Sequence, residues 1–169
     1  MLYIFLTFII YLFSVFWIGD YENLRSNSYY LSQNKILFND TIFNNIILNE
    51  KLNFYDDLNL NQKKLYQKAL EISGLDEFIK TKIEKDQFLI GDSGINLSGG
   101  QKQRVCIARL IFEDRDFNIM DEATSEMHSE LEFEIFNQLI KESKKEKTYI
   151  VISHNINLKN IFEKKIQLT

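Results

Sequence analysis

The sequence predicts an α/β fold with a parallel sheet, and three observations support this class. Phe117–Met120 has the length and apolar content of a short buried strand, interrupted only by Asn118, and Thr148–Ser153 is a continuous apolar run of strand length. Between them, Leu131, Ile135 and Leu139 recur at four-residue spacing, as on one face of a helix. Ser28–Leu31 adds a short strand earlier in the chain. A strand, a helix and a strand in that order predict a right-handed parallel crossover.

The bulk composition limits the class of protein. A chain of 169 residues is long enough for one domain with a real core. Its net charge of −4 gives no electrostatic reason to expect a nucleic-acid partner. Cys106 is the single cysteine, which excludes an internal disulfide and fits a reducing compartment. We expect it to be buried in a helix.

Residues 1–18 form an apolar segment without a charged side chain. On hydropathy they pass as a short membrane span. No basic residue lies near this segment before Arg25, so neither a secretory signal nor a fixed membrane orientation is indicated. Three interpretations stay open: a membrane anchor, a non-native start of the chain, and a buried segment that fills the core.

Between these regions the sequence predicts a small helical unit, roughly over residues 42–86. Asn61 is expected to cap a helix that ends at Gly74, because glycine tolerates the left-handed conformation that follows a helix. Asp76 is expected to cap a second helix that continues through Ile83.

The sequence Leu97-Ser98-Gly99-Gly100-Gln101 precedes another predicted helix, which continues to Phe112. If Ser98 is the N-cap, both glycines lie in the first turn, where backbone N–H groups have no intrahelical acceptor. These donors and the positive end of the helix dipole suit a phosphate oxygen. The simpler alternative is a serine-capped helix with a flexible entry.

Polar residues follow the predicted strands, at the sheet edge where ligands bind in open α/β folds. Asp121 can hold Mg²⁺, and Glu122 can orient or deprotonate an attacking water. His154 can contact a γ-phosphate or hold that water, and Gln33 can offer an amide oxygen to the metal. Taken singly, the acids also fit a helix cap and the histidine a structural role.

In their order and spacing these segments resemble the nucleotide-binding domain of an ATP-binding cassette (ABC) transporter of the exporter type. The resemblance covers the chain from about Gly19 onward. The matching segments are the Q-loop-like Tyr30–Gln33, the pre-signature loop Gly91–Gly94, the signature Leu97–Gln101, the Walker B-like Phe117–Asp121, the D-loop start Ala123–Ser125, and the switch-like Ser153-His154. The resemblance implies a partial P-loop NTPase (RecA-like) parallel sheet, with an inserted helical subdomain over about residues 42–108.

The resemblance also implies roles for individual residues and partners for the domain. Glu122 and His154 would be catalytic, while Gln33 and Asp121 would hold Mg²⁺. The signature, that is Leu97, Ser98, Gly99, Gly100 and Gln101, would contact the γ-phosphate of ATP bound by a second nucleotide-binding domain. The implied setting is the cytoplasmic face of a membrane, where ATP hydrolysis is coupled to transport through transmembrane domains.

One motif of the family is missing from the sequence. The P-loop pattern G-x-x-x-x-G-K-[ST], which cradles the phosphates, does not occur, and Gly19 is the only glycine before Gln33. Three interpretations follow: a fragment of an exporter ATPase domain that is inert alone, a degenerate partner that offers its signature to another subunit, and a membrane-anchored interaction protein without enzymatic activity. Glu126 and His128 are further departures, in the D-loop.

Overall fold

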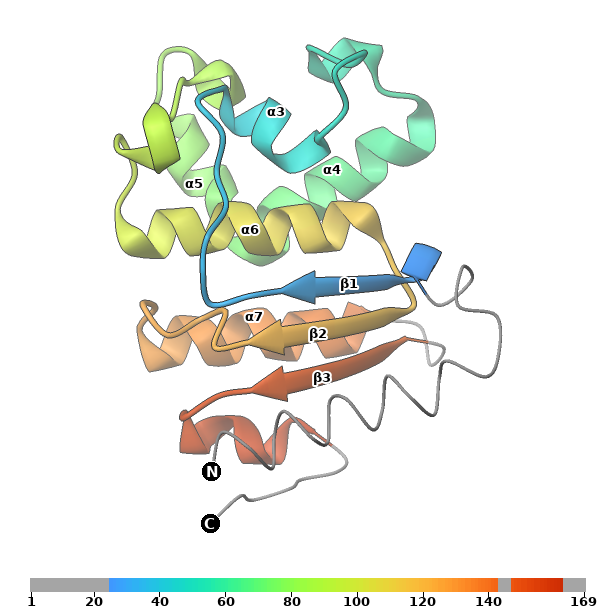
Figure 1. Ribbon diagram of the computed structural model, residues 1–169, viewed down its shortest axis with the longest axis vertical. Helices are drawn as coiled ribbons and strands as arrows, with labels where there is room; N and C mark the ends of the chain where they lie inside the picture. Colours follow the sequence, from blue (N-terminus) through green and yellow to red (C-terminus); the bar gives the residue numbers. More distant parts are fainter. Residues whose placement is uncertain (1–24, 143–146, 163–169) are drawn as a thin grey trace.

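A computed structural model describes residues 25–142 and 147–162 (Figure 1). The expectations for residues 1–18 therefore lie outside the described part of the chain. Within that part, no helix has both the length and the apolar character needed to cross a membrane. The elements in chain order are β1 (Ser28–Leu31), α3 (Ile42–Ile47), α4 (Leu60–Ser73), α5 (Leu75–Lys80), α6 (Gly99–Glu113), β2 (Phe117–Asp121), α7 (Ser129–Glu142) and β3 (Thr148–Ile152), with short 3₁₀ helices at Tyr55–Asp57, Lys85–Gln87, Asp92–Gly94 and Ile156–Asn160.

The three described strands form a parallel sheet in the order β1-β2-β3. Tyr30 pairs with Ile119 across β1 and β2, and Ile119 pairs with Ile150 across β2 and β3. Helix α7 lies between β2 and β3 in the sequence, so the predicted α/β class and parallel crossover are confirmed. The fold is consistent with part of a P-loop NTPase sheet.

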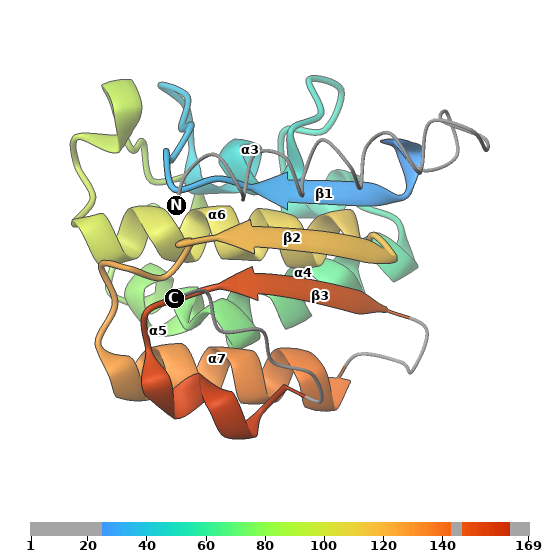
Figure 2. The same cartoon turned by 60° about the horizontal axis from the view of Figure 1, so that its bottom comes forward.

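The helices α3 to α7 lie on one face of this sheet (Figure 2). Leu31 and Met120 point into the core on that face and are buried. Tyr30, next to Leu31 on β1, and Ile150, which pairs with Ile119 next to Met120, are exposed on the other face. This alternation follows from the period of two in a strand, and it fixes which residues at the strand ends face the helices.

Helix α6 is the central element of the helical layer. It packs against α3, α4 and β1. Every residue from Val105 to Ile111 is buried. Cys106 is buried within it, as predicted, and burial raises the pKa of its thiol. Ser98 caps the helix, as predicted, and the helix extends one residue beyond the expected Phe112.

Two predicted caps in the helical unit are wrong. The N-cap of α4 is Asn59, because Asn59 and Gln62 form reciprocal side-chain bonds of 3.0 Å with each other's backbone N–H groups. Helix α5 begins at Leu75 directly after Gly74, so Asp76 lies in the first turn instead of capping it, and the helix ends at Lys80. Gly74 does adopt the left-handed conformation predicted for the end of α4.

Candidate functional site

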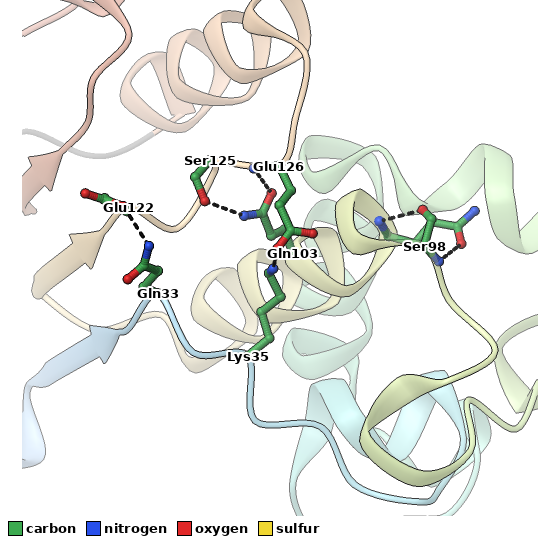
Figure 3. Close-up of polar contacts among 8 residues, drawn as sticks. Gln33, Lys35, Ser98, Gln103, Glu122, Ser125 and Glu126 are labelled. Atoms are coloured by element: carbon green, nitrogen blue, oxygen red, sulfur yellow. Dashed lines mark hydrogen bonds and ion pairs between the residues drawn. The ribbon is translucent and has the colours of Figure 1, made fainter.

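Three residues that follow the strands meet at the carboxyl edge of the sheet. The side-chain amide of Gln33, after β1, donates to Glu122 Oε2 at 2.8 Å (Figure 3). Glu122 Oε1 lies 3.0 Å from His154 Nε2, after β3. The carboxylate of Glu122 thus lies between the other two side chains. The structure brings together three of the residues predicted from the sequence, because parallel strands in register end at the same edge.

The backbone of Glu122 is unusual. Its φ is 47°, in the left-handed region that residues other than glycine rarely adopt. The Glu122 N–H donates to the carbonyl of Ile152 at 3.0 Å, so the neighbouring strand holds this conformation. Residues held in such sparsely populated conformations cluster at functional sites. The backbone geometry thereby turns Glu122 away from the strand direction and toward Gln33 and His154.

Asp121 lies beside this cluster but has a different partner. The hydroxyl of Tyr30 donates to Asp121 Oδ2 at 3.0 Å. Desolvation and this hydrogen bond raise the pKa of Tyr30 above its ordinary value. In residues 25–142 and 147–162, no group of three or more His, Cys, Asp or Glu side chains is arranged to hold a metal. Oxygen atoms of Asp121 and Gln33 fit Mg²⁺ only when a ligand's phosphates complete its coordination.

A second cluster, which the sequence did not predict, lies behind Glu122. The residue Glu132 in α7 is only 5% exposed, and its carboxylate is fully engaged in hydrogen bonds. It accepts hydrogen bonds from Thr124 Oγ1, from Ser153 Oγ at 3.1 Å, and from Asn155 Nδ2 at 2.5 Å. Glu132 therefore ties the segments that follow β2 and β3 to the same helix, and a cavity of about 480 Å³ borders both this cluster and Glu122.

The burial of Glu132 could have been predicted from its position in the sequence. It lies four residues before Phe136 and seven before Leu139, which places it on the buried face of α7. A glutamate on such a face needs hydrogen-bond donors nearby. Thr124, Ser153 and Asn155, close to the ends of both strands, supply them.

The start of α6 has the predicted geometry. Ser98 Oγ accepts from the N–H of Gln101 at 3.3 Å, and Gln101 Oε1 accepts from the N–H of Ser98 at 2.9 Å (Figure 3). The first-turn amides of Gly99 and Gly100 lie outside this reciprocal pair, and both glycines are partly exposed. Leu97 is buried in the core, so its side chain anchors the segment while its backbone leads into the helix.

Gln103 connects the start of α6 to the segment after β2. Its side-chain oxygen accepts from the N–H of Glu126 at 3.0 Å, and its amide donates to Ser125 Oγ at 3.3 Å (Figure 3). Gln103 is 1% exposed, so these bonds are shielded from water. The segment 123–126 is thereby held between Glu122 at one end and Gly99 at the other.

Comparison with known proteins agrees with this geometry. A family model described as "ABC transporter" matches residues 15–125. An ATP-dependent lipid A-core flippase of Vibrio vulnificus is 39% identical over 142 residues, which cover 83% of this chain and 23% of the flippase. A flippase of the same name from Legionella pneumophila is 36% identical over 136 residues, covering 80% of this chain and 22% of the relative.

A solved structure of a bacterial Atm1-family ABC exporter with ATP bound is similar in fold as well. The TM-score is 0.66 at 28% identity, with 79% of this chain and 22% of the exporter chain covered. The chain thus spans less than a quarter of the length of these relatives. It belongs to the ABC transporter family, and it corresponds to part of the ATP-binding domain of exporter-type members.

The buried Glu132 carboxylate gives a test of the hydrogen-bond cluster. We expect Glu132→Gln to lower the free energy of unfolding by about 1–3 kcal/mol, because an amide nitrogen then faces a donor and leaves a buried group unpaired. Chemical denaturation monitored by circular dichroism measures this loss. Glu134→Gln, on the exposed face of the same helix, is the control and should leave stability unchanged. Equal stability of the two variants would contradict the assigned bonds.

Proposed function

We propose that this chain acts in the ATP-binding domain of an ABC exporter, where ATP binding and hydrolysis are coupled to transmembrane transport. The observation that supports this most strongly is the Gln33–Glu122–His154 cluster at the carboxyl edge of the sheet. The family match and the exporter-type relatives support the same function. The domain would work at a membrane, together with transmembrane domains.

In this proposal each residue has a defined task. Glu122 accepts a proton from the attacking water, which its carboxylate orients. His154, 3.0 Å from that carboxylate, fixes the orientation of Glu122 and contacts the terminal phosphate. Asp121 and Gln33 would hold Mg²⁺ with their oxygen atoms, and the charge of the phosphates would be balanced there when the ion is bound.

The start of α6 would serve a different nucleotide. Ser98 and its reciprocal partner Gln101 hold the first turn in shape, and the residues Gly99 and Gly100 are partly exposed. We propose that these donors bind the γ-phosphate of ATP on a second nucleotide-binding domain. The role of the signature is then the same whether this chain is a fragment of a longer exporter or a degenerate partner.

The isolated 169-residue chain should not bind ATP–Mg²⁺ at micromolar concentration. A P-loop would add several charge-assisted contacts, each about 1.5–3 kcal/mol, and the sequence of this chain lacks that motif. Isothermal titration calorimetry measures the affinity directly. A dissociation constant in the micromolar range would show that this chain holds the phosphates in another way.

The signature should bind a complete partner only in the presence of ATP. We expect the chain to pair with the nucleotide-binding domain of the Vibrio vulnificus flippase when the catalytic glutamate of that domain is replaced by glutamine to trap ATP. Ser98→Arg should abolish pairing, because a long side chain blocks the amides of Gly99 and Gly100. Sedimentation velocity measures the complex.

Asn61→Arg is the matched control, since it places the same side chain on the exposed surface of α4. It should pair like the wild-type chain. Absence of an ATP-dependent complex with the wild-type chain, or equal pairing by both variants, would count against the proposed role of the signature.

A further inference from the structure

The side chain of Glu126 lies against the start of α6. A β-carbon built on Gly99 would overlap Glu126 Oε2. A β-carbon on Gly100 would lie 3.5 Å from the carbonyl oxygen of Glu126. A carboxylate of this same chain therefore occupies the space beside the first turn of α6, where the helix dipole favours negative charge.

Lys35 holds this carboxylate in place. Its Nζ forms an ion pair with Glu126 Oε1, and it reaches the segment after β2 from the loop that follows β1 (Figure 3). The Lys35 side chain is 16% exposed, whereas that of Glu126 is 50% exposed. The cation is thus largely fixed by its surroundings, and the carboxylate is the partner that water can reach.

We propose that Lys35 is an anion-binding residue of the signature site and that Glu126 is its internal competitor. In the unpaired chain, the carboxylate neutralises Lys35 and covers Gly99. When a phosphate of another subunit's nucleotide approaches, Glu126 turns into solvent and Lys35 pairs with the phosphate. This inference rests on the proposed function, because it concerns the regulation of the same signature.

The unequal exposure of the two partners determines which of them moves. A half-exposed carboxylate regains its hydration when it leaves the ion pair, whereas a mostly buried ammonium group left without a partner does not. Lys35 therefore exchanges one anion for another instead of remaining unpaired. A polyphosphate carries more negative charge than a single carboxylate, so it competes effectively once it is close.

The backbone around Glu126 does not need to move in this exchange. The N–H of Glu126 stays bonded to Gln103 Oε1 at 3.0 Å, and Ser125 Oγ accepts from the amide of Gln103. Neither bond involves the Glu126 carboxylate. Rotation of one side chain is enough to uncover Gly99.

The full 169-residue chain can be tested with sodium pyrophosphate as the probe. The shifts of the Gly99 and Gly100 amides in ¹⁵N-edited NMR spectra report binding at this position. We expect Glu126→Ala to raise the affinity for pyrophosphate about fivefold over the wild-type chain, the size of effect that one partly exposed ion pair can have. Glu126→Gln, which removes the charge but keeps the length, should give part of this gain.

Three further variants distinguish an effect of Lys35 from a general effect of net charge. Glu130→Ala changes the net charge equally at an exposed position outside this contact and should bind like wild type. Adding Lys35→Gln to Glu126→Ala should remove the gain, whereas adding Lys64→Gln on the exposed surface of α4 should not. Thermal unfolding of each variant checks that the fold is kept.

Unchanged pyrophosphate affinity in folded Glu126→Ala, including no binding at all, would overturn the proposal. A gain that survives Lys35→Gln would overturn the role of the lysine. Pairing with a complete ATP-bound domain is measured separately with the wild-type chain. If the wild-type chain pairs but Glu126→Ala does not change pyrophosphate binding, the proposed role of Glu126 is wrong and the proposed function is still supported. If Glu126→Ala raises the affinity for pyrophosphate but the wild-type chain does not pair with the ATP-bound domain, the proposed function is wrong.

Discussion

The parallel register of β1, β2 and β3 is the constraint on which the candidate site depends. Strand β2 lies between the other two, and its pairing fixes where each neighbouring strand ends. With Met120 opposite both Leu31 and Val151, the residues that follow emerge side by side. A slip of one residue would turn every side chain to the opposite face and would separate Gln33 and His154 from Glu122.

Two buried polar residues connect the segments that follow the strands to the helices. Glu132 gathers hydrogen bonds from both segments that follow β2 and β3, and so holds α7 under the strand ends. Gln103 holds residues 125 and 126 on α6. The segment 123–126 therefore connects the site at Glu122 to the start of α6. A movement of the Glu126 side chain takes place within this connection.

Local patterns in the sequence predict the elements well where the physical cause is local. Phe117–Met120 and Thr148–Ser153 predict β2 and β3, Ser98 predicts the start of α6, and Gly74 predicts the end of α4. The N-cap of α4 was misplaced because the sequence Asn59-Leu60-Asn61 offers two candidates. Gln62 decides between them, since it lies three residues after Asn59 and can bond back to it.

The site is predictable to the extent that parallel strands end at one edge, which places Gln33, Glu122 and His154 together. The contact of Glu126 with Gly99 was not predictable, because it depends on how residues 123–128 pass over α6. That path is set by Gln103, whose long-range bonds to Ser125 and Glu126 have no sequence signature. Side-chain contacts between segments so far apart in the chain follow only from the assembled fold.

The most direct test of this account is a nuclear Overhauser measurement on the full chain, labelled uniformly with ¹³C and ¹⁵N. The methylene protons of Glu122 should show contacts both to the side-chain amide protons of Gln33 and to the ring protons of His154. Amide contacts should also pair Tyr30 with Ile119 and Ile119 with Ile150. Contacts that pair Tyr30 with Asn118 or Met120 instead, with no Glu122 contact to Gln33 or His154, would contradict the account.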